Sequence, residues 1–196
     1  MKALAFVLAA AGTILLLQGL WLPAKAALAQ QLLARSWERT LADGARHPPW
    51  PWADHAPVAR LGLPGDRRFV VLDGDAGNVL AFAPGHNPAS GLPGMGETIV
   101  ISGHRDTHFR ALGDLHDGSE LTLEVPGASA RYRITGSRVV DARHWRQPIR
   151  QDERLLLVTC WPLDARTEGP QRLIVAAERV GGPRSPAAAD SADRGP

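Results

Sequence analysis

The chain has 196 residues, of which 44% are hydrophobic, and its formal net charge is +2 at pH 7. This length and composition are typical of one globular domain with additional segments. Because the charge is nearly balanced and no basic stripe is interleaved with aromatic residues, we expect no nucleic-acid partner.

The N-terminal stretch "MKALAFVLAAAGTILLLQGLWLPAKA" is apolar from Ala3 to Ala24, interrupted by Gln18. About 20 apolar residues allow a helix to cross a bilayer, and Trp21 stands where an interfacial anchor is expected. A cleaved signal peptide is the alternative, because "AKA" resembles a small-x-small cleavage site. The apolar run is long for a signal peptide, so we predict a retained transmembrane signal-anchor over residues 1–23. Under either interpretation, the rest of the chain is expected to lie outside the cytoplasm.

Residues 24–57 are predicted to form a helical stalk and a Pro/Trp linker. Leu33, Trp37 and Leu41 recur at intervals of four, which indicates a helix over residues 24–43, and Asp43-Gly44 ends it. The linker is "HPPWPWADHAP".

A β-domain is predicted over residues 58–180, because short strand-like segments follow one another between turn residues. The segments are "VARLGLP", "RRFVVLDG", "NVLAFA", "TIVISGH", "SELTLEV", "ARYRITGSRVVD", "RLLLVTC" and "RLIVAAERV". About eight short strands favour an all-β, closed or nearly closed barrel. A helical turn, "HFRALGDL", is expected after a cap at Asp106 or Thr107. The tail, residues 181–196, holds no large apolar residue, so we predict that it is disordered.

The only cysteine, Cys160, ends the apolar strand "LLLVTC". One thiol cannot form an internal disulfide, and a buried structural cysteine is the simplest alternative. However, His104 ends another apolar strand, and Arg172 begins the last one. An antiparallel turn between the last two strands would place Cys160 beside Arg172. A thiolate, an imidazole and a guanidinium together favour acyl transfer by a thiol.

These segments resemble a sortase. "TIVISGHRDTHFRALGDLHDGSELTLE", "LLLVTC" and "QRLIVAAERV" follow one another in the order of that family, and the similarity covers roughly residues 50–180. The upstream "PWPWADHAPVARLGLP" and the short N-terminal anchor resemble the Gram-negative, marine proteobacterial subgroup in particular.

The resemblance implies a membrane-anchored cysteine transpeptidase on an eight-stranded β-barrel. Such an enzyme cleaves a C-terminal sorting signal of the Leu-Pro-x-Thr-Gly type through a thioacyl intermediate, and it passes the substrate protein to an amine acceptor. By position, Cys160 would be the nucleophile, His104 the acid and base, and Arg172 the group that stabilises the carbonyl oxygen. The implied location is the inner membrane, with a single-pass anchor and the catalytic domain on the periplasmic side.

Several interpretations remain open beside this one. The same triad would serve a thiol hydrolase or protease that releases the substrate to water, and a membrane-tethered barrel that only binds would need no reactive thiol. Thr159 and Asp106 are candidate substrate contacts, although Asp106 also suits a helix cap. We expect Arg105 and Arg110 to form a solvated face.

Metal sites and cofactors are not expected. His104 and His108 do not share a helical face, and the sequence lacks the Glu of a His-Glu-x-x-His motif, which disfavours zinc. No loop spaces acidic ligands like an EF-hand, which disfavours calcium.

The segment between the sixth and seventh predicted strands, residues 141–153, is short. In sortases, which this sequence resembles, that segment shapes the pocket for the sorting motif.

Overall fold

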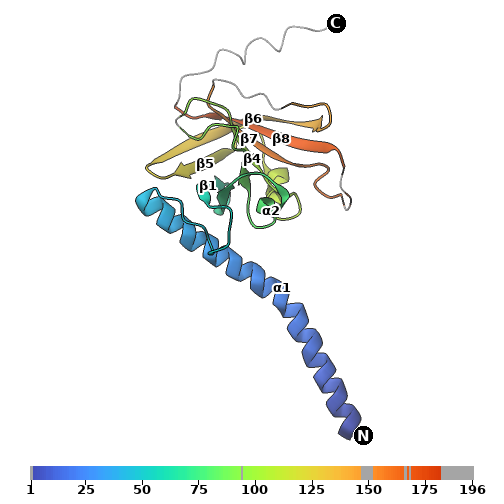
Figure 1. Ribbon diagram of the computed structural model, residues 1–196. Helices are drawn as coiled ribbons and strands as arrows, with labels where there is room; N and C mark the ends of the chain where they lie inside the picture. Colours follow the sequence, from blue (N-terminus) through green and yellow to red (C-terminus); the bar gives the residue numbers. More distant parts are fainter. Residues whose placement is uncertain (1, 94, 147–151, 166, 168, 182–196) are drawn as a thin grey trace.

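The structure is a computed structural model that describes residues 2–93, 95–146, 152–165, 167 and 169–181. A long helix, α1 (Lys2–Asp43), runs from the N-terminus to a β-barrel (Figure 1). The predicted disordered tail lies outside the described residues, apart from Gly181, and so does the centre of the predicted short segment 141–153.

The second half of α1 packs on the barrel, as the spacing of its apolar residues predicts. Leu33 and Trp37 are buried, and Leu33 belongs to a cluster with Leu72, Val79 and Ala83. The helix ends at Asp43, and the N–H of Gly44 donates to the Thr40 carbonyl at 2.8 Å. Gly44 has a φ of +71°, a left-handed conformation that glycine adopts without steric cost. The predicted helix over residues 24–43 and its end are confirmed.

The predicted transmembrane anchor over residues 1–23 is not found in the structure. Residues 2–23 form the first half of α1, which continues through Pro23. Within the described part of the chain, no helix has both the length and the apolar character that crossing a membrane requires.

The described residues form eight strands, which close into a barrel in the order β1-β2-β3-β4-β7-β8-β6-β5. β5 also pairs with β1, and two neighbouring pairs, β2–β3 and β4–β7, are parallel while the others are antiparallel. The strands are β1 (Pro57–Leu63), β2 (Arg67–Asp73), β3 (Gly85–His86), β4 (Ile99–Ser102), β5 (Glu120–Val125), β6 (Ala128–Asp141), β7 (Arg154–Cys160) and β8 (Gln171–Arg179). The predicted barrel is confirmed.

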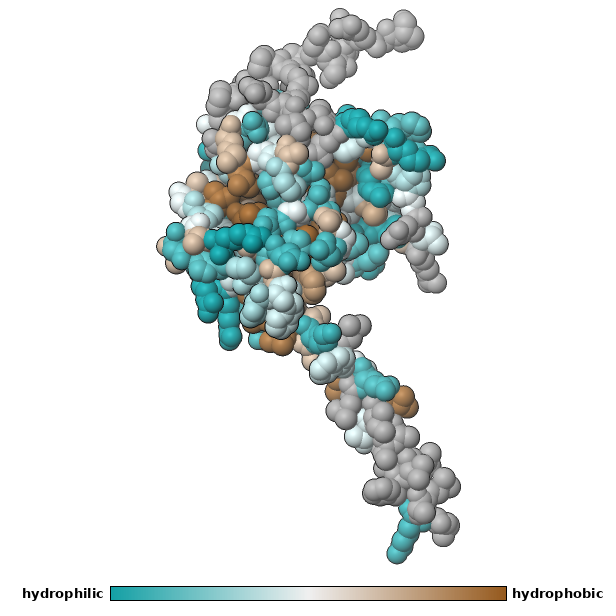
Figure 2. Space-filling view, in the orientation of Figure 1, coloured by the Kyte–Doolittle hydropathy of each residue, from teal (hydrophilic) through white to brown (hydrophobic). Residues whose placement is uncertain are grey.

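Apolar residues fill the barrel from alternating positions along the strands. On β5, Leu121 and Leu123 are buried while Glu120 and Thr122 are exposed, as the alternation predicts. β7 and β8 are apolar on both faces because a second cluster covers their outer side, where Val100, Leu156 and Ile174 pack near Trp145. Hydrophilic residues cover much of the visible barrel surface, with apolar groups between them (Figure 2).

The prediction of a strand over residues 78–83 is wrong. Residues Gly77–Leu80 form a short helix, α2, and the two-residue strand β3 lies further on, at Gly85–His86. Val79 and Ala83 are buried whereas Phe82 is exposed, so the buried positions are four apart and follow a helical period. A short apolar run does not distinguish these two periods.

Tyr132 joins the barrel interior to a polar network at its surface. Its ring is fully buried, and its hydroxyl donates to Glu153 Oε1 at 2.7 Å, while Arg179 pairs with Glu153 Oε2 at 2.9 Å. Burial raises the pKa of the Tyr132 phenol, and the neighbouring carboxylate raises it further, so the hydroxyl remains a donor.

We expect Tyr132→Phe to lower the free energy of unfolding by about 1–2 kcal/mol, because the Glu153 oxygen loses its donor. Urea denaturation followed by circular dichroism measures the effect. Arg138→Ala is the control, because Arg138 is exposed on the same strand, β6, and takes no part in this network. An unchanged urea midpoint in Tyr132→Phe would contradict a stabilising hydrogen bond.

Candidate active site

The parallel pairing of β4 with β7 brings the end of one strand to the end of the other. Ser102 pairs with Val158, and the N–H of Gly103 continues the ladder by donating to the Val158 carbonyl at 3.0 Å. If the same register continued for two more residues, His104 would lie beside Cys160. Both strands run in the same direction, so the segments that follow them leave the barrel at the same rim.

The antiparallel pairing of β7 with β8 adds the third residue. Cys160 lies directly opposite Arg172 in this register, as predicted from the sequence. β7 is therefore the middle strand of three, with His104 approaching from the β4 side and Arg172 from the β8 side. Cys160 is a free thiol and half-buried, and His104 is exposed.

The guanidinium of Arg172 is held at one of its nitrogens. Nη1 donates to the carbonyl oxygens of Gly169 at 2.7 Å and Gln171 at 2.9 Å. Among the described residues, Nε and Nη2 have no hydrogen-bond partner. Two of the guanidinium nitrogens thus remain available to another acceptor, while the third fixes the side chain on the loop between β7 and β8.

Thr159 fixes the ends of β4 and β7 to each other. Its side chain is only 2% exposed, and its hydroxyl donates to the Gly103 carbonyl at 2.7 Å. Gly103 is the residue before His104, so this bond positions the backbone that carries the imidazole. The substrate contact expected of Thr159 stays a prediction.

The turn after His104 depends on a glycine at position 103. The Phe109 N–H donates to the His104 carbonyl at 3.0 Å, which folds the chain back on itself. Phe109 is fully buried against Gly103, where a Cβ atom would lie 2.7 Å from the Phe109 ring. A side chain at position 103 would displace this ring and the His104 loop with it.

The expectation that Arg105 belongs to a solvated face is wrong. Arg105 is only 4% exposed, and its guanidinium donates to the carbonyl oxygens of Pro162 and Thr167, each at 3.1 Å. Arg105 therefore connects the loop that follows His104 with the loop that follows Cys160. Sequence reasoning missed it because a charged residue in a loop resembles an exposed one.

The expected helix cap at Asp106 or Thr107 is also wrong. The helical turn is a 3₁₀ helix, η1 (Arg110–Asp114), and Phe109 precedes it without a side-chain cap. Asp106 instead accepts a hydrogen bond from Arg105 Nε at 3.2 Å, and the Thr107 hydroxyl lies 3.1 Å from His108 Nδ1. Asp106 is exposed, and its contact with substrate stays a prediction.

His108 is half-buried beside this site. Its ring meets Phe69 edge to face, with 5.8 Å between centroids. Burial lowers the pKa of His108, and the nearby His104 lowers it further, so the His108 imidazole is neutral at neutral pH. No group of three or more potential metal ligands gathers anywhere in the described residues.

We expect Thr159→Val to reduce any Cys160-dependent activity by about tenfold and to lower the free energy of unfolding by about 1–2 kcal/mol, because the Gly103 carbonyl loses its donor. Peptide cleavage kinetics and urea denaturation measure the two effects. Thr159→Ser keeps the hydroxyl and should restore most of both. If the serine variant fails as badly as the valine variant, the hydroxyl is not what matters at this position.

Comparisons with known proteins all find the same family. The sortase domain family matches residues 63–180. "Sortase D" of Bacillus subtilis (strain 168) is 33% identical over 112 residues, which cover 56% of this chain and 57% of that protein. The solved catalytic domain of B. anthracis SrtD is 30% identical, with a TM-score of 0.54 over 64% of this chain and 88% of that one. Sortase A from Corynebacterium diphtheriae is 25% identical, with a TM-score of 0.55 over 69% of this chain and 65% of that one.

The family match covers more than half of the chain, so the chain belongs to the sortase family, whose members are cysteine transpeptidases. The resemblance predicted from the sequence is confirmed at this level. The chain spans little more than half the length of the Bacillus subtilis protein.

Proposed function

We propose that this chain is a transpeptidase that cleaves a sorting signal of the Leu-Pro-x-Thr-Gly type and transfers the substrate protein to an amine. The observation that carries this proposal is the register of three neighbouring strands. Cys160 ends the middle strand, Arg172 lies opposite it, and His104 follows the strand on its other side.

The chemistry assigned to the three residues has two halves. In the first, the Cys160 sulfur attacks the carbonyl carbon of the scissile peptide bond. The C–N bond breaks, and the leaving amine takes a proton from the His104 imidazolium. In the second, an acceptor amine attacks the thioester carbon and the C–S bond breaks. His104 takes up the proton that the acceptor amine loses, which restores its imidazolium form.

Arg172 has the donors that the developing negative charge needs. Its Nε and Nη2 are without partners among the described residues, and a guanidinium stays protonated at any relevant pH. Donors held in place before the reaction stabilise an oxyanion without reorganising during it. The bonds from Nη1 to the loop carbonyls support such a fixed position.

The test is mass spectrometry of the purified chain mixed with sorting-signal peptides. The proposal expects a mass increase on Cys160, equal to the acyl fragment, that hydroxylamine reverses. Peptide cleavage without any adduct on Cys160 would overturn it. Release of the acyl group to water, unaffected by added amines, would favour the thiol hydrolase that uses the same three residues.

We expect Arg172→Lys to lower the rate of peptide cleavage by about 100-fold, because an ammonium does not reproduce the planar set of guanidinium donors. Chromatography of the cleavage products measures the rate. Arg179→Lys is a matched control on the same strand, where the side chain is exposed and pairs with Glu153. Full activity in Arg172→Lys would remove Arg172 from the site.

The location and the subgroup are further parts of the proposal. The apolar run from Ala3 to Ala24 supports export, with the catalytic domain on the periplasmic side of an inner membrane. Membrane attachment and the Gram-negative subgroup stay predictions from the sequence. Fractionation of cells tests attachment, which requires the full chain to resist extraction by salt and by carbonate. A non-catalytic barrel would show neither thiol adduct nor cleavage.

A further inference from the structure

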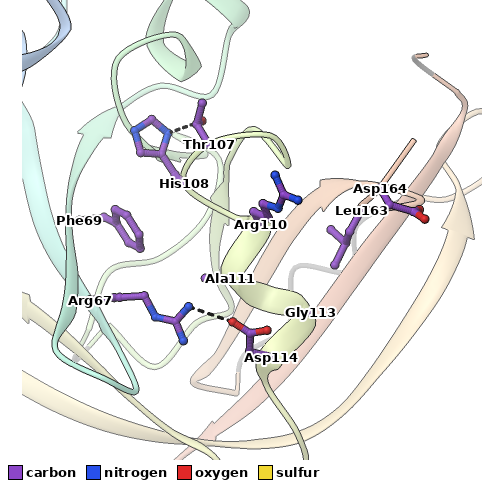
Figure 3. A pocket seen from close by; sticks show the side chains of 10 residues that line it. All are labelled: Arg67, Phe69, Thr107, His108, Arg110, Ala111, Gly113, Asp114, Leu163 and Asp164. Atoms are coloured by element: carbon purple, nitrogen blue, oxygen red, sulfur yellow. Dashed lines mark hydrogen bonds and ion pairs between the residues drawn. The ribbon is translucent and has the colours of Figure 1, made fainter. Parts of the chain in front are cut away.

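A pocket of about 510 Å³ lies between β2, the segment after His104 and the loop after Cys160 (Figure 3). Two of the segments that line it are the ones that follow the candidate residues in the chain. His108, Arg110 and Ala111 come from the segment after His104, and Leu163 and Asp164 come from the loop after Cys160. Arg67 and Phe69 of β2 contribute a third side.

Two charged residues of the pocket form an ion pair with each other, and two others have no partner among the described residues. Arg67 Nη1 pairs with Asp114 Oδ2 at 3.0 Å, and a dashed line marks this bond in Figure 3. Arg110 and Asp164 have no hydrogen-bond or ion-pair partner among the described residues. One cation and one anion therefore remain available to a ligand, with Phe69 and Leu163 as the apolar part of the lining.

The pocket is on the histidine side of Cys160. The lining residue Thr107 is three residues after His104, in the segment that continues from the end of β4. Arg172 reaches Cys160 from the opposite neighbour strand, β8, and is not part of the lining. An amine that attacks the thioester must deliver its proton to His104, so it approaches from this side.

We propose that this pocket binds the acceptor, and that the acceptor is a primary amine that carries a carboxylate, as an amino acid or a peptide does. Arg110 binds the carboxylate, and Asp164 attracts the ammonium form of the amine before it loses its proton. The acceptor role rests on the proposed function, whereas binding of the amine does not. In the transfer step, the amine nitrogen bonds to the thioester carbon, sulfur leaves as the Cys160 thiol, and one proton passes from nitrogen through His104 to sulfur.

The test compares triglycine with triglycinamide, which differ only in the terminal carboxylate. After a sorting peptide has acylated the full chain, the ratio of transfer to hydrolysis is measured for each acceptor. This ratio reports only the second half of the reaction. We expect the wild type to prefer triglycine by about fivefold, Arg110→Ala to lose that preference, and Asp164→Asn to need about fivefold more of either amine. Arg68→Ala and Asp117→Asn are exposed controls outside the pocket and should behave as the wild type.

A second measurement is independent of acylation. Saturation-transfer NMR detects binding of triglycine to the unacylated chain, and Arg110→Ala should weaken the signal. If Arg110→Ala abolishes triglycine binding but sorting peptides never acylate the wild-type chain, the proposed function is overturned and the amine-binding site remains. Equal transfer ratios for the two acceptors, or triglycine binding that neither pocket variant changes, would overturn the assignment of this pocket.

Discussion

Cys160→Ala is expected to abolish the acyl-enzyme and to lower peptide cleavage by at least about 1,000-fold, because no other nucleophile replaces the sulfur. Mass spectrometry should find no adduct on the variant, and chromatography should find uncut peptide. The side chain is half-buried and makes no disulfide, so the barrel should remain folded.

The fold of this variant is checked by its urea midpoint, which should stay within about 1 kcal/mol of the wild type in free energy. Cleavage that persists in a folded Cys160→Ala chain would assign the reaction to another group. A loss of cleavage with loss of fold would be explained by structure alone, and Cys160→Ser, which keeps the size of the side chain, then separates the two causes.

His104→Asn is expected to lower cleavage by about 100-fold to 10,000-fold, since the leaving amine loses its proton donor. The pH dependence of cleavage should also change, because the group proposed to transfer the proton is gone. Stopped assays between pH 5 and pH 9 measure both effects.

His116→Asn is the matched control, because His116 is exposed and lies outside the pocket beside the candidate residues. It should keep both the rate and the pH profile of the wild type. A His104→Asn variant with the wild-type pH profile would show that another residue transfers the proton.

The sequence predicted the barrel because most of its strands carry their own signal. The alternation on β5 and the two-sided apolar character of β7 and β8 are local patterns. The pairing of Cys160 with Arg172 was predictable because an antiparallel turn joins neighbouring strands. Residues 78–83 were misassigned because a short apolar run fits a helix as well as a strand.

The contacts that support the site were not predictable in the same way. Arg105 is buried only because the loop after β7 folds over it and offers the carbonyls of Pro162 and Thr167. The Thr159 hydroxyl meets Gly103 only because β4 and β7 pair in one register out of several. Such contacts depend on tertiary structure, for which a single sequence holds no periodic pattern.

The parallel pairing of β4 with β7 also determines when reactivity arises during folding. β5 and β6 lie between β4 and β7 in the chain. The contact between β4 and β7 therefore closes a long loop, and the chain loses conformational entropy when this contact forms. A chain that has not yet closed its barrel keeps the thiol away from the imidazole. On the proposed mechanism, reactivity is thus coupled to completion of the fold, and a chain that is still unfolded carries an ordinary, unassisted cysteine.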